Sequence, residues 1–317
     1  MRALVTGAAG FVGGWMVEAL VRRGDEVHGL ALPPAPDTVA PGGMRQPHHW
    51  HHGDVRDPAV LAAALEASRP DAVFHLAGVS SVGGAASDPG LAADINVTAT
   101  VRLLAAVARL RTDGIADPVV LVVGSGEQYG VHPIERQPLP ESTEQRPLTL
   151  YAATKAAQEL FARQAWRRDG VRVVCARSFN HSGAGQSETF LLPALVRRAL
   201  RLREQGGGQL RLGNTTPIRD LSHVSDVVAA YILLAERGEA GEAYNVCRGA
   251  GWTVGELAAA VLRRVGVDAP LAEDPALVRP VDVPALVGDA TRLRALGWAP
   301  AHTLDDCIDD LIHAATH

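Results

Sequence analysis

Short apolar runs alternate along the chain with longer segments in which apolar residues recur every three or four positions. Runs at 3–6, 71–78 and 119–123 have the length and composition of buried strands, whereas 58–68 and the segment ending at Gly24 have helical spacing. Strands that alternate with helices form a parallel sheet with helices on both faces. The pattern therefore predicts an α/β fold with a Rossmann-type doubly wound parallel sheet.

A glycine-rich turn joins the first strand to the first helix, with glycines at positions 7, 10 and 13. Gly7 permits a tight turn, Gly10 lets the backbone approach a pyrophosphate, and Gly13 allows close packing of helix on strand. The exposed N–H groups of the helix N-terminus then face the phosphates. This succession of strand, turn and helix predicts a dinucleotide site.

The second strand, Glu26 to Leu30, leaves the choice of dinucleotide open. An acidic residue at its end would hold the ribose of NAD, and an arginine would suit the phosphate of NADP. The chain instead has Ala31, Leu32 and two prolines there. Asp54 ends the next strand, and we expect it to accept a hydrogen bond from the adenine amino group, although a helix cap or a turn would equally explain it.

Four histidines surround Trp50 in the segment His48 to His52. Alternate residues of a strand point the same way, so His49 and His51 could pair around a metal ion. No carboxylate or cysteine with ligand spacing accompanies them in the sequence, and we therefore predict no metal site.

Tyr151 and Lys155 lie four positions apart at the start of a helical segment, so they project from the same face. A nearby ammonium favours the phenolate, and we expect Lys155 to lower the pKa of Tyr151 and make it a usable proton donor and acceptor. An amphipathic helix that happens to carry both residues is the alternative. A further helix, Pro89 to Leu110, contains Asn96, which is more typical of local hydrogen bonding than of catalysis.

Composition narrows the class of protein. The 317 residues suffice for one large or two moderate domains, and 47% hydrophobic with 21% charged residues is ordinary for a globular chain. A net charge of −5 offers no basic surface for nucleic acid. Three widely spaced cysteines indicate buried thiols in a cytoplasmic enzyme. Because we find no apolar run near the ~18 residues that a membrane span needs, we expect no membrane partner.

These features together resemble the extended short-chain dehydrogenase/reductase family, which acts on nucleotide sugars. The resemblance covers nearly the whole chain and rests on Thr6–Gly13, Gly53–Val55, His75–Ala77, Ser125, and Tyr151 with Lys155. The family's catalytic trio of Ser or Thr, Tyr and Lys implies Ser125, Tyr151 and Lys155 here. The family's cofactor is NAD or NADP, and the residues implied to bind it are Gly7, Gly10, Phe11, Val12, Gly13, Asp54, Val55, Leu76, Ala77, Tyr151 and Lys155.

The C-terminal half resembles the subgroup of GDP-6-deoxy-4-keto-mannose reductases. Segment 177–186 looks like its FNHxGPGQ motif, with Ala184 in place of the usual proline, and 279–283 looks like RPxEV, with Asp in place of Glu. The Arg219–Asp220 pair matches an RD pair whose arginine holds a substrate phosphate, as guanidinium groups do well; a surface salt bridge is the alternative. The implied substrate-binding residues are Ser125, Asn180, Arg219, Arg279 and Asp282.

The order of segments also suggests two domains. We expect residues 1–177, with a return segment at about 214–247, to form the NAD(P)-binding Rossmann domain. Residues 178–213 and 248–317 should form a smaller α/β lobe that binds the nucleotide sugar, with a helix from Ser222 to Glu236 on the cofactor side. The resemblance implies a homodimer formed through the helices at 89–110 and 151–166.

Three functions remain open at this point. The first is NAD(P)H-dependent reduction of the 4-keto group of a nucleoside-diphosphate 6-deoxyhexose, giving GDP-rhamnose or its 4-epimer if the substrate is GDP-linked. The second is a GDP-sugar 4,6-dehydratase or a nucleotide-sugar 4-epimerase with retained NAD(P). In the dehydratase, Glu127 would serve as the base. The third, a non-catalytic dinucleotide-binding sensor, would need the glycine turn but not the catalytic trio.

Overall fold

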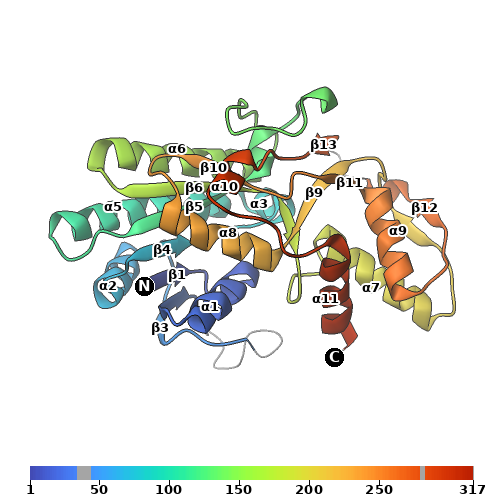
Figure 1. Ribbon diagram of the computed structural model, residues 1–317, viewed down its shortest axis with the longest axis horizontal. Coiled ribbons are helices and arrows are strands. Elements are labelled where there is room, and N and C mark those ends of the chain that lie inside the picture. The colour runs from blue at the N-terminus through green and yellow to red at the C-terminus, as the bar shows by residue number, and fades with distance from the viewer. Residues whose placement is uncertain (34–43, 279–282, 317) are drawn as a thin grey trace.

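A seven-stranded, entirely parallel sheet forms the centre of the molecule (Figure 1). The computed structural model describes residues 1–33, 44–278 and 283–316. The strands, in their order across the sheet, are β3 (His49–His52), β2 (Glu26–Ala31), β1 (Arg2–Thr6), β4 (Ala72–His75), β5 (Val119–Ser125), β6 (Arg172–Ser178) and β10 (Ala243–Val246). The first six follow the strand order of dinucleotide-binding folds, which confirms the predicted doubly wound sheet.

Helices cover both faces of this sheet (Figure 1). Alternate strand residues face opposite sides, so Val5 and Phe74 pack with one group of helices, whereas Leu4 and Val73 pack with the other. The first group is α1 (Phe11–Arg23) and α8 (Val224–Arg237), and the second is α2 (Pro58–Ser68), α5 (Ala99–Thr112) and α6 (Leu150–Asp169). Both faces are therefore buried, as a parallel sheet requires.

Capping residues set where two of these helices begin. Asp57 caps α2 by accepting from the backbone N–H of Ala59, and Pro58 occupies the first turn, as the sequence predicts. The predicted start of α8 at Ser222 is wrong by two residues. Ser222 and His223 belong to strand β9 (Ile218–His223), and the His223 ring accepts from the backbone N–H of Ser225 to begin the helix at Val224.

The predicted helix from Pro89 to Leu110 is interrupted. It consists of α4 (Pro89–Ala93), one π-helical turn (Asp94–Thr98) and α5, and Asn96 lies buried in the π turn. Contrary to our expectation, Pro89–Thr112 is long and apolar enough to cross a membrane by length and composition, with a mean hydropathy of 1.5. In this structure the segment lies over the sheet, where α5 supplies Leu103 and Val107 to the core.

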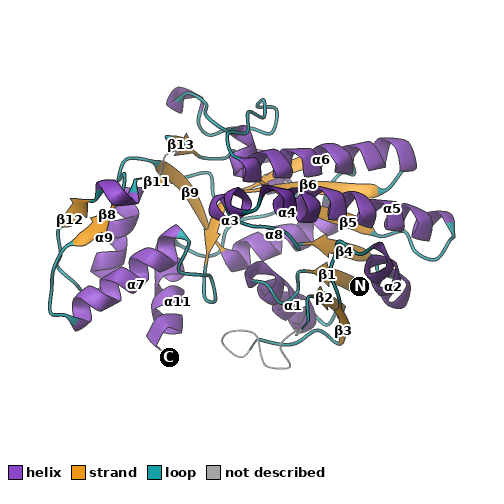
Figure 2. Cartoon of the chain, turned by 180° about the vertical axis from the view of Figure 1, so that it is seen from behind, coloured by secondary structure: helices purple, strands orange, loops and turns teal. Residues whose placement is uncertain are grey.

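A smaller lobe lies beside the carboxyl end of the sheet and has its own hydrophobic core (Figure 2). Strand β9 is its centre and connects to three short strands, β7 (Asn180–Ser182), β11 (Gly251–Thr253) and β13 (Ala285–Leu286). A second pair, β8 (Leu210–Leu212) and β12 (Leu271–Glu273), packs with α7 (Leu191–Glu204), α9 (Val254–Val265) and α11 (Leu304–Thr316). The shorter helices are α3 (Val82–Ser87) and α10 (Thr291–Ala295).

Candidate active site

The turn between β1 and α1 has the close packing that its glycines allow. Gly7 has a φ of 71°, and a Cβ there would lie 2.8 Å from the backbone nitrogen of Ala77. A Cβ on Gly13 would lie 2.0 Å from the Gly7 carbonyl oxygen. Gly10 precedes α1 without any side-chain cap, so the N–H groups of the first helical turn are available to an anion. This backbone fits the pyrophosphate of a dinucleotide.

A buried hydrogen-bond chain connects this turn to the α6 helix. The Thr100 hydroxyl donates to the Asn96 carbonyl at 2.7 Å and accepts from the Gln158 amide at 2.9 Å. His75 Nε2, 3.0 Å from the same hydroxyl oxygen, must then donate, and His75 Nδ1 accepts from the Thr6 hydroxyl at 2.8 Å. Burial lowers the pKa of His75 to about 3, so its ring is neutral at physiological pH.

Lys155 ends this chain at the carboxyl edge of the sheet. Its ammonium donates to the Gln158 side-chain oxygen at 3.1 Å and to the Val123 carbonyl at 2.8 Å. A Cβ built on Gly78 would lie 3.6 Å from the ammonium nitrogen, so the loop after β4 passes close to it. Burial lowers the pKa of Lys155 to about 8. The ammonium is thus held at the place where β4, β5 and α6 converge.

Tyr151 meets Ser125 at the end of β5. Burial raises the pKa of Tyr151 to about 12, although the nearby Ser125 side chain favours the phenolate. The expectation that Lys155 lowers this pKa is not met in this structure, since the ammonium is turned to Val123 and Gln158. At neutral pH the phenol carries its proton.

Glu127 also acts on this phenol. Its carboxylate lies near enough to raise the pKa of Tyr151 further, and its backbone N–H donates to the Ser125 hydroxyl oxygen at 3.2 Å. Ser125 begins a short 3-10 turn, Gly126–Tyr129, which carries Glu127 toward Tyr151. The structure therefore brings the side chains of Ser125, Glu127 and Tyr151 together at the end of β5, whereas the Lys155 ammonium is held by Val123 and Gln158.

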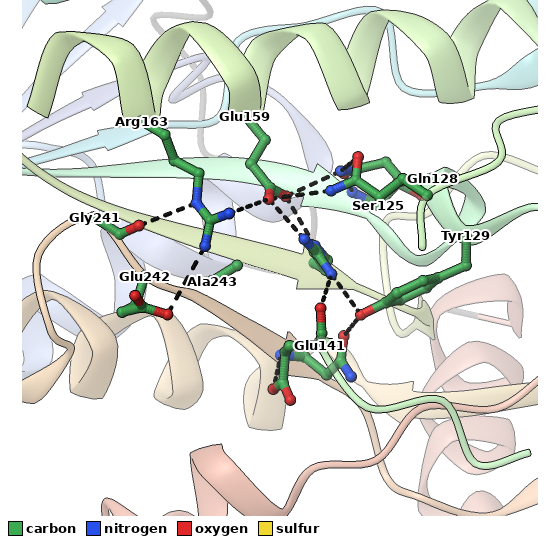
Figure 3. Close-up of polar contacts among 12 residues, drawn as sticks. Ser125, Gln128, Tyr129, Glu141, Glu159, Arg163, Gly241, Glu242 and Ala243 are labelled. Carbon is green, nitrogen blue, oxygen red and sulfur yellow. Dashed lines mark hydrogen bonds and ion pairs between the residues drawn. The ribbon is translucent and has the colours of Figure 1, made fainter. Parts of the chain in front are cut away.

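A buried polar network supports Ser125 from behind (Figure 3). Gln128 accepts from the Ser125 backbone N–H at 2.7 Å and donates to the Glu159 carboxylate at 3.1 Å. The same carboxylate accepts two hydrogen bonds from Arg177, at 2.9 and 2.7 Å, and each of these two charged side chains is 4% exposed. Arg177 also donates to the Tyr129 hydroxyl and so connects α6, β6 and the turn that carries Ser125.

The sequence analysis did not assign roles to His75, Thr100, Gln128, Gln158 and Glu159. Gln158 and Glu159 lie three and four residues after Lys155, so helical spacing alone places them on the face of α6 that Lys155 occupies. Gln128 lies three residues after Ser125, the spacing of a capping box, and the two residues form one. The hydrogen bonds of His75 to Thr6 and Thr100 join distant parts of the chain, and no spacing rule in the sequence connects these residues.

Asp54 pairs with a neighbour in the chain, whereas Asn96 binds residues distant in the sequence. The Asp54 carboxylate accepts from the Arg56 backbone at 2.8 Å and from its guanidinium at 2.6 Å, which lowers the pKa of the carboxyl group. Asn96 accepts from the Val79 backbone N–H at 2.8 Å and donates to the Thr154 hydroxyl at 2.9 Å. It thereby fastens the loop after β4 to α6, so its hydrogen bonds are structural, as expected, but not local.

The smaller lobe contacts the beginning of α1, the helix that follows the glycine turn, at Phe11 and Trp15. Phe11, at the start of α1, stacks on His181 of β7 with ring centroids 6.2 Å apart. Trp15 donates its indole N–H to the Ala184 carbonyl at 3.0 Å, and the Ala184 backbone N–H donates to Asp310 of α11 at 2.8 Å. The beginning of α1 and the C-terminal helix therefore hold the same loop.

The predicted substrate-binding residues lie on the lobe or outside the described part of the chain. Asn180 is half-buried on β7 beside Leu221 of β9. Arg219 is buried and donates to the Val283 carbonyl at 2.7 Å. Arg279 and Asp282 lie outside the described residues. Of the two arginines expected to bind a diphosphate, the structure therefore describes Arg219 alone.

Comparison with known proteins identifies the family to which the chain belongs. Residues 4–311 match the family described as GDP-mannose 4,6 dehydratase. The chain is 33% identical to the GDP-6-deoxy-D-mannose reductase of Pseudomonas aeruginosa, over 96% of this chain and 93% of that protein.

Solved structures agree with this similarity. The structure of RMD from Pseudomonas aeruginosa complexed with NADPH has a TM-score of 0.83 and 30% identity, covering 99% of this chain and 98% of the other. The UDP-glucose 4-epimerase of Thermus thermophilus complexed with NAD has a TM-score of 0.84 and 29% identity, covering 100% and 99%.

Proposed function

Because the chain belongs to the GDP-mannose 4,6 dehydratase family of extended short-chain dehydrogenases/reductases, we propose that it is an NAD(P)H-dependent reductase. Its proposed substrate is a nucleoside-diphosphate 6-deoxyhexose, of which it reduces the 4-keto group. The similarity to a GDP-6-deoxy-D-mannose reductase along nearly the whole chain favours GDP-6-deoxy-4-keto-D-mannose, with GDP-rhamnose or its 4-epimer as product. The observation that supports the proposal is the position of the Ser125 side chain beside the Tyr151 phenol at the carboxyl end of β5.

Each catalytic side chain has a proposed role in this reduction. Bound NAD(P)H would supply the hydride to carbon 4. Tyr151 gives its phenolic proton to the carbonyl oxygen as negative charge develops, and the Ser125 hydroxyl donates a hydrogen bond to the same oxygen. Lys155, whose ammonium is held by Val123 and Gln158 in this structure, would hold the nicotinamide ribose and supply positive charge to the site.

Reduction and its alternatives use the Tyr151 proton in opposite directions. A dehydratase or an epimerase with retained NAD(P) begins by oxidising its sugar, which requires the tyrosine to accept a proton first. With a pKa of about 12, Tyr151 is protonated at neutral pH and is ready to donate instead. The second candidate keeps one observation in its favour, which is the carboxylate of Glu127 beside Tyr151.

The remaining site residues complete the proposal. We assign the dinucleotide to Gly7, Gly10, Phe11, Val12 and Gly13 because a side chain at the first or third glycine would collide with backbone. The other cofactor contacts, at Asp54, Val55, Leu76 and Ala77, and the substrate contacts, at Asn180, Arg219, Arg279 and Asp282, are proposed from the family resemblance.

Two larger features are also proposals. Residues 1–177 with the return segment 214–247 would form the cofactor domain, and 178–213 with 248–317 the nucleotide-sugar lobe. A homodimer would form through the α5 and α6 helices, which expose the apolar side chains of Val101, Leu160 and Phe161. A cytoplasmic location is consistent with the three buried free thiols.

One experiment separates the reductase from its alternatives. The enzyme is incubated with GDP-mannose without added NAD(P)H, and in parallel with GDP-6-deoxy-4-keto-D-mannose and NADH or NADPH. We expect stoichiometric consumption of reduced cofactor only in the second reaction. Formation of a 4-keto sugar from GDP-mannose would identify a dehydratase instead, and inactivity in both reactions with either cofactor would count against this substrate.

A further inference from the structure

Four ionisable side chains gather on one face of the outermost strand pair, β2 and β3. Glu26 and His28 are two residues apart on β2, and His49 and His51 are two apart on β3, so each pair points to one side of the sheet. His28 lies directly opposite His49 in the strand register. The His28 ring stacks on the His49 ring with centroids 4.5 Å apart, and on the His51 ring at 5.3 Å.

The distances within this cluster suit a small divalent ion. The Glu26 carboxylate oxygen Oε1 lies 3.3 Å from His28 Nε2 and 3.8 Å from His49 Nε2. All three ligand atoms fall within 4.8 Å of one another, and the described residues contain no other such group of three. Tetrahedral zinc, with bonds of about 2.0–2.1 Å to nitrogen and oxygen, sets its ligand atoms about 3.3 Å apart.

We propose that Glu26, His28 and His49 bind a divalent transition-metal ion, zinc in the first instance, with water in the fourth position. Two imidazoles and one carboxylate are a ligand set that zinc prefers. His28 is buried, whereas Glu26 and His49 are exposed, so an ion can reach the site from solvent. The proposal departs from the sequence-based expectation of no metal site.

His51 completes the arrangement without binding the ion. Its Nε2 lies 3.0 Å from His28 Nδ1. When His28 Nε2 binds the metal, His28 Nδ1 carries the ring proton and donates a hydrogen bond to His51 Nε2. A hydrogen bond of this kind fixes both the tautomer and the orientation of a metal-binding imidazole.

The site would join the last strand to the rest of the sheet. Strand β3 pairs only with β2 within the described residues, and it is four residues long. A metal held by both strands would add a cross-link to this short pairing and so resist its separation. Because Glu26 begins β2 and the catalytic residues lie at the carboxyl ends of the strands, the ion would stabilise the fold without taking part in turnover.

The test uses the full chain, without an affinity tag and freed of metal with a chelator. Zinc is titrated in competition with a chromogenic chelator, and the thermal midpoint is measured with and without zinc. The variants are His49→Ala and the isosteric Glu26→Gln, and the control is His52→Ala, which removes an exposed histidine that stacks on Trp50. Cobalt in place of zinc reports the coordination number through its visible absorption.

We expect one zinc ion per chain, a higher thermal midpoint with zinc, and the absorption of four-coordinate cobalt. Each of the two ligand variants should bind at least tenfold more weakly, and His52→Ala should bind as the parent does. The proposal is overturned if the parent takes no zinc from the competitor, if both ligand variants bind unchanged, or if His52→Ala loses as much affinity as they do. Since no step depends on turnover, these outcomes are independent of the proposed reductase activity.

Discussion

Tyr151 keeps its proton because it is buried beside Glu127, and only the Ser125 hydroxyl opposes that effect. Replacing Tyr151 with Phe removes the proposed proton donor while leaving the ring in place. We expect turnover to fall about a hundred- to ten-thousand-fold, the usual contribution of a general acid. The affinity for NADPH, measured by the quenching of tryptophan fluorescence, should be nearly unchanged.

The control for this variant is Tyr244→Phe, which deletes a buried hydroxyl whose partner, the Glu239 backbone N–H, is remote from the proposed chemistry. It should keep almost full activity. Equal losses in the two variants would show that any missing buried hydroxyl impairs the enzyme, and full activity of Tyr151→Phe would remove Tyr151 from the mechanism.

The pKa of Lys155 sets a second expectation at this scale. Burial lowers it from the ordinary value of 10.5 to about 8, so the ammonium loses its proton as the pH rises through 8. If the charged form is needed, kcat/KM for reduction should fall above that pH, since this parameter reports groups of the free enzyme. Tyr151, with a pKa of about 12, adds no break below pH 10. A profile that stays flat to pH 10 contradicts this role for Lys155.

Individual residues were predictable where family motif and strand position agree, as for Ser125, Tyr151 and the glycines of the first turn. The pKa values of Tyr151 and Lys155 could not be predicted from the sequence. The lysine expected to face Tyr151 donates to Val123 and Gln158 instead, and this choice depends on a carbonyl from β5 and on burial, neither of which sequence spacing specifies.

At the scale of single elements, the turn before α1 tolerates no side chain at Gly13, since a Cβ would lie 2.0 Å from the Gly7 carbonyl oxygen. Gly13→Ala should therefore displace α1 from β1 and weaken NAD(P)H binding at least tenfold, as measured by calorimetry. Gly83→Ala is a matched control in the short α3 helix, where an added Cβ meets nothing within 4 Å. It should bind cofactor normally and gain about 0.5–1 kcal/mol in unfolding free energy.

The ion pair between α6 and β6 gives a different kind of test. Arg177→Met removes two hydrogen bonds from the buried Glu159 carboxylate and leaves Arg163, 4.0 Å away, as a neighbouring cation, which costs up to about 3–5 kcal/mol of unfolding free energy. Arg168→Met breaks an exposed pair with Asp169 and should shift the urea midpoint much less. Urea denaturation of the two variants measures the difference. Equal midpoints would mean that the buried pair contributes no more than the exposed one.

Element boundaries followed from the sequence where a cap or a proline marks them, as at Asp57 and Pro58. Predicted boundaries were wrong where contacts with distant parts of the chain determine the end of an element. Ser222 and His223 continue β9 because β7 lies beside them, and the helix from Pro89 is broken by a π turn that buries Asn96 against Val79 and Thr154. In both places the deciding partner is distant in the chain.

At the scale of the whole molecule, the helical face of α5 and α6 exposes Leu160 at 65% and Phe161 at 40%. If this face forms the proposed dimer, Leu160→Glu should give a monomer in light scattering, because a charge would be buried at the interface. The control, Leu277→Glu, changes a comparably apolar exposed position on the other lobe and should leave the mass of the parent. A parent that is already monomeric rules out this dimer.

The sheet order was predictable because alternating strands and helices restrict the topology to a few arrangements. The histidine cluster was not, although all its histidines were visible in the sequence. Its carboxylate comes from Glu26, 23 residues before His49, and only the pairing of β2 with β3 brings the two together. A metal site divided between neighbouring strands has no fixed spacing to search for.

The loop at Ala184 has a consequence for biosynthesis. The backbone N–H of Ala184 is held by Asp310, which the ribosome adds 126 residues later. During translation the glycine turn can form early, yet the loop that faces it lacks this anchor until the final helix emerges. We therefore expect a nascent chain stalled before α11 to bind NAD(P)H but not to position the sugar nucleotide beside it.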